Sequence, residues 1–411
     1  MGKSIKNILF INHSVRDGGP GRSLFYILKY IDRKKVKPYI LIPKDDIFSE
    51  NLKNESIYEN IIVDSRFPEN IFVPRLGMEI YNNKSDSLDF STKLKKVFAS
   101  IINIFELIVL VLTSGKIINE NNINIVYCNG TIAKVVGTFI GKFNNKPVIW
   151  HVRNIQQTYV LKTIITKLSS YESVKKIICV SNATSTQFQH VMHKVHVVYN
   201  GIDPADYSPA KTKGTLRSEY KISKDTVVIG STGRLVPRKG YIHIIEAAKY
   251  LKENSHNKNF VFVIVGDTPH FFQYNHLDYL KKKVSEYGLD DHFIFTGYKG
   301  DIKPYLKNFD IFVIPSNYPD PFPRSVIEAM CFNLPVIGFK IGGIAEAINN
   351  KVTGFLSEKD DVANLSENIL TLVNNGDMRK EMGTASRERV VKICNAKDIS
   401  TAIQEIILSV N

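Results

Sequence analysis

Cysteine is scarce in this 411-residue sequence, and the few cysteines present exclude several kinds of site. Cys128, Cys179, Cys331 and Cys394 are far apart and show neither a CxxC pair nor a spacing typical of metal ligands. Three of them lie in or beside apolar runs, where a thiol is usually buried and unreactive. We therefore expect free, buried thiols and a reducing compartment.

Long apolar runs are also few. The run near the N-terminus, within MGKSIKNILFINHSV, is too short for a signal peptide, which favours a cytoplasmic protein. The longest run is 98–113 (FASIINIFELIVLVLT), with Glu106 as its only charge. At about 16 residues it falls short of the roughly 20 that span a bilayer. We expect a buried helix here; the alternative is a helix on a membrane surface, led in by Lys93, Lys95 and Lys96.

Acidic residues are the minority, and the imbalance belongs to one half of the chain. The net charge is +14; residues 1–200 hold 27 Lys and Arg against 15 Asp and Glu, whereas residues 201–411 hold 27 against 25. A basic first half favours an anionic membrane surface, a lipid-phosphate acceptor or an acidic glycan as partner, and an ordinary solvated surface is the alternative. No nucleic-acid motif accompanies the charge, so nucleic acid is not an expected partner.

Sequence repeats and low-complexity tracts are absent, but one structural pattern occurs twice. Short apolar runs of strand type alternate with helical patterns in both halves, which predicts an α/β protein with parallel sheets. We expect three segments: a domain over 1–200, a second domain over 201–390, and a C-terminal helix over 391–411 that returns to the first domain. Residues 44–92 are polar and irregular, typical of a functional insertion or mobile cap, and residues 209–223 indicate a linker.

The most informative loop is 319–328, PDPFPRSVIE, between a predicted strand at 309–314 and a predicted helix. Pro321 and Pro323 suit a loop that ends at a helix N-terminus, whose unpaired N–H groups attract phosphate or sugar oxygens. Asp320 and Glu328 flank this loop and would accept hydrogen bonds from hydroxyl groups. The combination suggests a ligand with both phosphate and sugar hydroxyls; the alternative is a helix start with a surface Asp and a capping Glu.

Three other loops follow predicted strands, where ligands bind in open α/β sheets. The first contains Gly18 and Gly19; it is not GxGxxG, so the dinucleotide fingerprint is absent. The second begins with His151, which either orients a substrate hydroxyl or is a structural histidine. The third holds Arg234 and Lys239, two cations that suit a pyrophosphate or form a basic surface loop.

Together these loops resemble the retaining glycosyltransferases of family four, over nearly the whole chain. The resemblance rests on GGP at 18–20, HVR at 151–153, NGID at 200–203, GRLVPRKG at 233–240, VGD at 265–267, FTGY at 295–298 and DPFPRSVIEAMCFNLPVIGFKIGG at 320–343. It implies the GT-B fold, in which two Rossmann-like parallel-sheet domains face each other across a cleft.

The resemblance also implies roles for individual residues. Arg234 and Lys239 would hold the diphosphate of a nucleotide-sugar donor, Glu328 its ribose, and Asp320 its sugar. The implied catalytic set is His151, Arg234, Lys239 and Asp320. The other implied donor-binding residues are Gly18, Gly19, Gly297, Tyr298, Phe322, Pro323, Arg324 and Ser325. Asn129 and Arg153 would lie on the acceptor side.

Two departures from the family pattern leave the donor sugar open. Asp320 replaces the usual Glu, which shortens the side chain by one methylene, and Pro323 replaces the usual Gly, which removes one N–H donor. No DxD-type motif is evident, so neither a metal nor a cofactor besides the donor substrate is expected.

The expected function is therefore a metal-independent, retaining hexosyltransferase-like activity. It would move a sugar from a nucleotide diphosphate sugar to a hydroxyl of a glycan or lipid-linked saccharide during cell-surface polysaccharide synthesis. We expect a cytoplasmic enzyme, peripheral on the inner face of the cell membrane. The alternatives are a GT-B nucleotide-sugar epimerase and a non-catalytic partner subunit of a transferase.

Overall fold

The computed structural model describes residues 5–13, 18–55, 60–67, 90–257, 259–269 and 274–410, with residues 90–96 described by their backbone alone. The chain divides into two compact units. Unit 1 comprises Met1–Gly201 with Ala396–Asn411, and unit 2 comprises Ile202–Asn395. The divisions expected from the sequence, after residues 200 and 390, lie one and five residues before the observed ones.

Unit 1 is built on a seven-stranded parallel sheet with the order β3-β2-β1-β4-β5-β6-β7. Its strands are β1 (Lys6–Asn12), β2 (Val36–Ile42), β3 (Ile61–Val63), β4 (Ile125–Asn129), β5 (Val148–Val152), β6 (Val174–Cys179) and β7 (Val195–Val197). The central strands are apolar along most of their length because helices cover both faces of the sheet.

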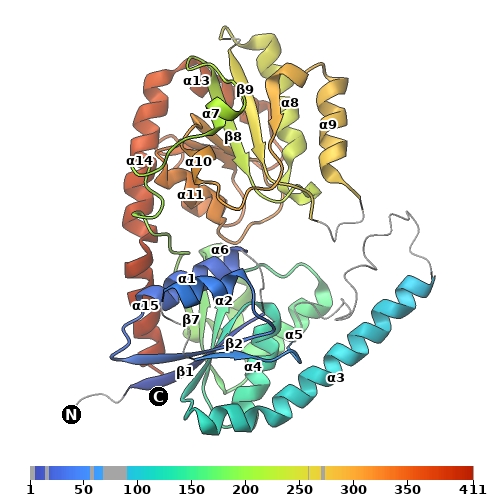
Figure 1. Cartoon of the computed structure of the whole chain (residues 1–411), viewed down its shortest axis with the longest axis vertical. Coiled ribbons are helices and arrows are strands. Elements are labelled where there is room, and N and C mark those ends of the chain that lie inside the picture. Colours follow the sequence, from blue (N-terminus) through green and yellow to red (C-terminus); the bar gives the residue numbers. More distant parts are fainter. Residues whose placement is uncertain are drawn as a thin grey trace. The chain divides into compact units, whose positions relative to one another are not determined.

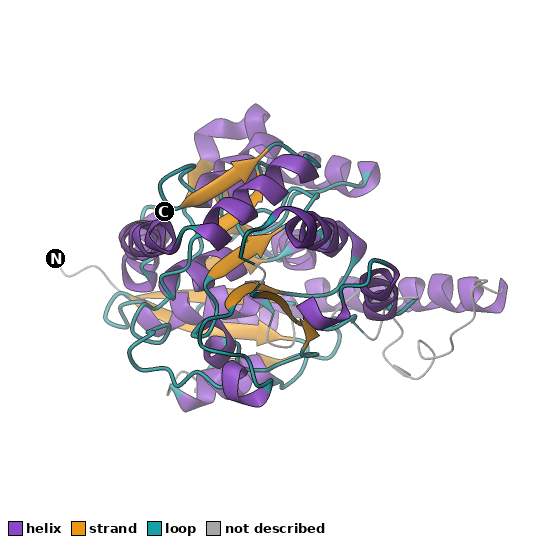
Figure 2. Ribbon diagram, turned by 90° about the horizontal axis from the view of Figure 1, so that it is seen from above, coloured by secondary structure: helices purple, strands orange, loops and turns teal. Residues whose placement is uncertain are grey.

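Two helical layers cover this sheet (Figures 1 and 2). One hydrophobic core lies beneath α1 (Gly19–Tyr30), α2 (Ile47–Asn54) and α15 (Ala396–Leu408). The other lies beneath α3 (Phe90–Glu120), α4 (Thr131–Phe143) and α5 (Tyr159–Ser169). The short helices α6 (Asn182–Ser185) and η2 (Thr186–Lys194) connect β6 to β7. Helix α15 lies along α1, where Ser400 Oγ donates a hydrogen bond to Ile27 O at 2.9 Å.

Two expectations for unit 1 were wrong. Within the described part of 44–92, the chain forms α2 and β3, and Asp46 starts α2 by accepting bonds from Phe48 N and Ser49 N. Residues 68–89 of that segment lie outside the described residues. The run at 98–113 belongs to a much longer helix, α3, and is not buried: one side of α3 packs on the core, while its opposite side is exposed.

Unit 2 has a six-stranded parallel sheet with the order β10-β9-β8-β11-β12-β13. Its strands are β8 (Val227–Thr232), β9 (Phe260–Val265), β10 (Phe293–Phe295), β11 (Ile311–Ile314), β12 (Val336–Phe339) and β13 (Gly354–Ser357). Its helices are α7 (Leu216–Glu219), η3 (Pro237–Lys239), α8 (Tyr241–Asn254), α9 (His276–Glu286), η4 (Asp290–His292), α10 (Lys303–Leu306), α11 (Arg324–Cys331), α12 (Ile344–Ala347), α13 (Val362–Asn374) and α14 (Gly376–Cys394).

The segment expected to be a linker, 209–223, is packed into unit 2. It contains α7, whose Leu216 is fully buried. Arg217 Nη2 also donates to Asp310 Oδ2 at 3.0 Å. The polar composition of this segment therefore did not predict its short helix, which one ion pair and one buried leucine hold in place. The expectation of free, buried thiols is confirmed for Cys128, Cys179, Cys331 and Cys394.

Each sheet has a topological switch point, where the strand order reverses between two neighbouring strands. In unit 1 it lies between β1 and β4, and in unit 2 between β8 and β11. Ligands of open α/β sheets bind beyond the carboxyl ends of the strands at such points. The residues singled out in the sequence follow β1, β4, β5, β8, β10 and β11, and so lie at these ends.

Candidate functional site

The cations and acids expected to bind a donor meet at the switch point of unit 2. Lys239 lies in η3, after β8, and Asp320 lies in the loop after β11. Lys239 Nζ donates to Asp320 Oδ2 at 2.7 Å, and the side chains are only 20% and 14% exposed. The ion pair therefore joins two loops whose contributing residues are 81 positions apart in the chain.

A glycine allows the β8 loop to approach the end of β11. Gly240, between η3 and α8, has a φ of +69°, in the left-handed region that favours glycine. A Cβ atom at this position would lie 2.0 Å from Pro315 O. Position 240, the last of GRLVPRKG, therefore requires glycine, because a side chain would overlap the backbone after β11.

The loop that carries Asp320 is held from the other side by the chain after β12. Gly343 N donates to Asp320 O at 2.7 Å. A Cβ atom on Gly343 would lie 2.0 Å from Pro321 O, so the two backbones are in direct contact. The paired glycines after β12 therefore act as the support of the Asp320 loop.

Substitution of Gly343 tests this support. We expect Gly343→Ala to reduce turnover by at least about tenfold, or ~1.4 kcal/mol, because the added methyl group overlaps the backbone and displaces the Asp320 loop. The matched control is Gly300→Ala, where a Cβ atom meets nothing within 4 Å. Steady-state rates of both variants, with thermal melts to verify folding, give the comparison. Equal rates in the two variants would contradict the role of Gly343.

Glu328 is buried in the first turns of α11, where two donors orient its carboxylate. Arg324 Nε lies 3.3 Å from Glu328 Oε1, an i,i+4 pair on one side of the helix. Tyr207 also donates its hydroxyl proton to Oε1, at 3.2 Å. The side chains of Arg324 and Glu328 are only 7% and 5% exposed. The carboxylate is consequently rigid, as recognition of a hydroxyl pair requires.

Arg234 is an exposed cation of the same loop. Its side chain reaches solvent by surface area, although protein atoms surround it on most sides. That partial burial, followed by the charge of Arg238, lowers the pKa of Arg234, while Asp320 opposes the shift. Arg234 remains charged at neutral pH, because the pKa of an arginine is so far above 7 that this shift does not remove its proton.

The remaining donor-side residues are placed in two groups. Pro323 caps α11 and precedes Arg324, Phe322 is buried, and Ser325 is half-buried. Gly297 and Tyr298 follow β10, two strands from β8. There Gly266 N donates to Gly297 O at 3.0 Å, and the ring of Tyr298 is 67% exposed.

In unit 1, Arg153 is held by three acceptors from three segments. Nε donates to Asn129 Oδ1 at 2.5 Å, Nη1 donates to Asn200 Oδ1 at 2.6 Å, and Nη2 lies 3.2 Å from His151 Nδ1. Asn129 also donates Nδ2–H to Asn12 Oδ1 at 2.9 Å, across the β1/β4 switch point. The network fixes the guanidinium at the carboxyl ends of β4 and β5.

The neighbours of His151 determine its tautomer. Nδ1 lies within hydrogen-bond distance of Arg153 Nη2 and of the Tyr127 hydroxyl. Guanidinium N–H groups can only donate, so Nδ1 accepts and the proton of the neutral ring is on Nε2. Burial, followed by the charges of Arg153 and Lys134, lowers the pKa of His151 well below 6.5. At neutral pH this histidine therefore offers one N–H donor, at Nε2, and is not a general base.

The lowered pKa of His151 predicts a pH effect on stability. Below pH 6.5 the unfolded chain takes up a proton at this imidazole while the folded chain does not, so stability falls with pH by about 1.4 kcal/mol per unit. Urea unfolding at pH 6.5 and 5.0 should show a smaller pH dependence for His151→Asn, by at most about 1.6 kcal/mol, and its amide oxygen keeps an acceptor near Arg153. Equal pH dependence in both proteins would contradict a neutral His151.

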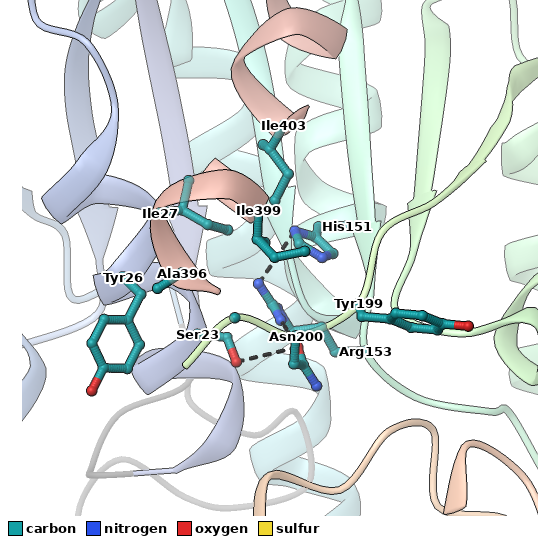
Figure 3. A pocket seen from close by; sticks show the side chains of 11 residues that line it. Ser23, Tyr26, Ile27, His151, Arg153, Tyr199, Asn200, Ala396, Ile399 and Ile403 are labelled. Atoms are coloured by element: carbon teal, nitrogen blue, oxygen red, sulfur yellow. Dashed lines mark hydrogen bonds between the residues drawn. The ribbon is translucent and has the colours of Figure 1, made fainter. Parts of the chain in front are cut away.

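A small pocket lies beside Arg153, and the side chains that line it hold Arg153 in place (Figure 3). Ser23, Asn200 and Arg153 line it together with Ile399 and Ile403 of α15. Ser23 Oγ donates to Asn200 Oδ1 at 3.2 Å, the same oxygen that accepts from Arg153, as Figure 3 shows. Side chains fill this pocket so closely that no space for a water molecule remains. It therefore orders Asn200 and Arg153 and does not hold a sugar.

The glycines expected at the start of unit 1 lie at the N-terminus of α1. Gly18 precedes the helix, Gly19 is its first residue, and Asn129 Nδ2 donates to Pro20 O at 3.1 Å. The helix start thus connects to the Arg153 network. Among the described residues, no group of three or more His, Cys, Asp or Glu side chains is placed to hold a metal ion.

Sequence reasoning missed several residues that hold the site together. Tyr207 lies 121 positions before its acceptor Glu328, and Tyr127 lies 24 positions before His151. Asn200 opens the NGID stretch, but its role as acceptor for Arg153 and Ser23 depends on three segments meeting. No local pattern signals such contacts, because each partner is an ordinary residue in its own segment.

Two family models match this chain, one in each unit. The profile described as "Glycosyltransferase Family 4" matches residues 17–206, and the profile described as "Glycosyl transferases group 1" matches residues 212–389. The crystal structure of Anabaena HepE in complex with UDP and glucose superimposes with a TM-score of 0.78 over 98% of this chain and 100% of that one, at 22% identity. This similarity shows the fold.

Curated relatives show lower coverage. The UDP-Gal:alpha-D-GlcNAc-diphosphoundecaprenol alpha-1,3-galactosyltransferase of Escherichia coli is 26% identical over 295 residues, 67% of this chain and 73% of that protein. The capsular polysaccharide biosynthesis glycosyltransferase CapM of Staphylococcus aureus is 22% identical over 373 residues, 82% of this chain and 93% of that protein. The fold and family expected from the loops are confirmed: the chain is a glycosyltransferase of family four with the GT-B fold.

Proposed function

We propose that this chain transfers one hexose from a UDP-sugar to a hydroxyl of a lipid-linked saccharide or cell-surface glycan, with retention at the anomeric carbon. The observation that carries the proposal is the constellation at the β8/β11 switch point, where Lys239 pairs with Asp320 beside Arg234. A buried, oriented acid, Glu328, completes the unit 2 constellation in α11.

The proposed chemistry is stabilisation of a leaving group. As the bond between the sugar and the diphosphate breaks, negative charge grows on the diphosphate oxygens. Lys239, held by Asp320, and Arg234 are cations at the edge where that charge would develop, and groups placed in this way supply the largest catalytic term in many enzymes. In this arrangement Glu328 accepts hydrogen bonds from the ribose hydroxyls and Asp320 from the sugar.

Retention would follow from attack on the face that the diphosphate leaves. Asp320 Oδ2 already holds Lys239, and Glu328 Oε1 accepts from Tyr207 and Arg324, so both acids are engaged in binding and not poised as nucleophiles. The acceptor hydroxyl would then attack directly, without a covalent sugar–enzyme intermediate, and pass its proton to the departing diphosphate.

The role proposed for unit 1 is to bind the acceptor. Arg153 and Asn129 form a fixed polar edge for the acceptor, and His151 donates Nε2–H to a hydroxyl. Gly18 and Gly19 provide backbone N–H groups at the start of α1, which suit an anionic group of a substrate. The proposal includes no metal and no cofactor besides the donor, because arginine and lysine already provide the positive charge.

The names of relatives support the choice of substrates. The E. coli relative uses UDP-galactose and a diphosphoundecaprenol-linked saccharide, and CapM acts in capsular polysaccharide biosynthesis. Because undecaprenol-linked acceptors are held in a membrane, we place the reaction at the inner face of the cell membrane.

A donor screen followed by a product assay tests this function. Incubation with UDP-glucose, UDP-galactose and UDP-N-acetylglucosamine should raise the melting temperature for the true donor, since ligand at 100 times its Kd adds about 2.7 kcal/mol. With lipid-linked saccharide acceptors, UDP release and an axial anomeric bond by NMR should follow, unchanged by EDTA. An epimerised sugar from donor alone indicates the epimerase, and activity only when another protein is added indicates a partner subunit.

A further inference from the structure

Helix α3 has two opposite apolar sides, and only one is covered. Ala99, Leu107, Leu110, Val111 and Ile118 are buried, and all but Ala99 belong to a core shared with α4 and α5. The opposite side carries eight large apolar residues that are each 41–66% exposed; these are Val97, Phe98, Ile101, Ile102, Ile104, Phe105, Ile108 and Leu112. We call these eight residues the α3 stripe. Their spacing repeats every three to four residues, so they form one continuous stripe along the helix.

Positive charge accompanies the α3 stripe on the same face of unit 1. Among the described side chains of α3, α4 and α5, four lysines are exposed, namely Lys116, Lys142, Lys162 and Lys167, whereas Lys134 of α4 is buried. Lys162 and Lys167 of α5 are exposed, next to the exposed apolar residues Tyr159 and Val160. Exposed lysines therefore lie on the same helical layer of unit 1 as the exposed apolar surface.

The helix is long and apolar enough to cross a bilayer, but its contacts prevent that. Val97–Glu120 spans 24 residues and contains an 18-residue window with a mean hydropathy of 2.2. Its second half is bound to the sheet layer: Leu110 is fully buried, and Asn144 Nδ2 donates to Ser114 Oγ at 2.9 Å. Crossing a membrane would remove these residues from the core of unit 1. A helix with one side in protein and the other apolar side exposed is suited to lie at an interface.

We propose that the α3 stripe inserts into the surface of an anionic lipid bilayer, with Lys116 of α3 and Lys162 and Lys167 of α5 against the lipid phosphates. The combination of aliphatic and phenylalanine side chains with flanking lysines matches the acyl and headgroup layers of such a surface. A protein partner would need complementary acids around an apolar groove, whereas a bilayer supplies both features along the whole helix. This inference is independent of the proposed reaction, because membrane binding needs neither donor nor acceptor.

Vesicle flotation of the full chain tests the proposal. Vesicles of phosphatidylglycerol and phosphatidylcholine should carry the protein upward, vesicles of phosphatidylcholine alone much less, and binding should weaken with salt. Ile101→Glu with Phe105→Glu should reduce the partition coefficient by at least about tenfold. Lys162→Gln and Lys167→Gln should each reduce it by about fivefold at low salt.

Matched controls lie in unit 2. Tyr279→Glu with Val352→Glu introduces the same charge at exposed apolar residues, and Lys281→Gln with Lys282→Gln removes exposed lysines; neither pair should change vesicle binding. Circular dichroism and thermal melts verify that each variant folds. Absence of flotation, equal loss in the controls, or a dimer that dissociates on Ile101→Glu with Phe105→Glu would overturn the proposal; the dimer would identify a second copy as the occupant.

Discussion

Glu328→Ala should reduce kcat/KM by at least about a hundredfold, or ~2.7 kcal/mol. Glu328 is 4% exposed and accepts from Tyr207 and Arg324, so its carboxylate has one orientation from which to bind a ribose. Removal of the acid also breaks a buried ion pair, which typically costs about 3–5 kcal/mol of unfolding free energy. Kinetics and urea unfolding of the same variant measure both effects.

Glu328→Gln separates recognition from folding. The amide keeps an acceptor for Tyr207 and Arg324 but loses the charge that strengthens a bond to a hydroxyl. We expect this variant to be more stable than Glu328→Ala and to show a higher KM for the nucleotide sugar. If Glu328→Ala retained near wild-type turnover, Glu328 would be a structural residue of α11 and its assignment to the donor site would be wrong.

The second large effect is expected at the cations after β8. Arg234→Ala and Lys239→Ala should each lower kcat by about 10²- to 10³-fold, because each removes a fixed charge from the edge where the diphosphate leaves. The loss should appear mainly in kcat, since the charge on the diphosphate increases in the transition state. Lys282→Ala, at an exposed lysine of α9, is the matched control and should leave kcat unchanged.

The two variants should differ in one respect, because Lys239 forms an ion pair with Asp320. Lys239→Ala leaves Asp320, 14% exposed, without its lysine partner, so part of its effect acts through the Asp320 loop. Arg234→Ala differs, because its guanidinium reaches solvent and Asp320 acts on it through charge at longer range, together with Arg238 and Tyr241. Turnover close to wild type in both variants would remove the diphosphate assignment from this loop.

The strands and loops of both units were predictable from local patterns. The predicted strand at 309–314 contains β11, because its four residues form a short run of buried apolar side chains. The DPFP and GRLVPRKG loops were recognisable because proline and glycine constrain the backbone locally. These signals act within about a dozen residues and need no knowledge of the fold.

The exposure of α3 shows where such reasoning fails. The apolar run 98–113 predicted a buried helix, yet the structure covers only the side that meets α4 and the sheet. Hydropathy reports what a side chain prefers and not which neighbours the fold provides. The error for the polar segment 209–223 was the opposite one. It was predicted to be a linker, but a buried leucine and an ion pair with Asp310 pack α7 into unit 2.

The sequence by itself determined the two parallel-sheet units, the loops that follow their strands, and the types of group those loops carry, because periodicity and backbone constraints are local properties. Only the tertiary structure decided which groups meet: Lys239 with Asp320, Tyr207 with Glu328, and Arg153 with Asn129, Asn200 and His151. The physical reason is the strand order, which places β8 beside β11 and β1 beside β4 and so brings distant loops to the same edge.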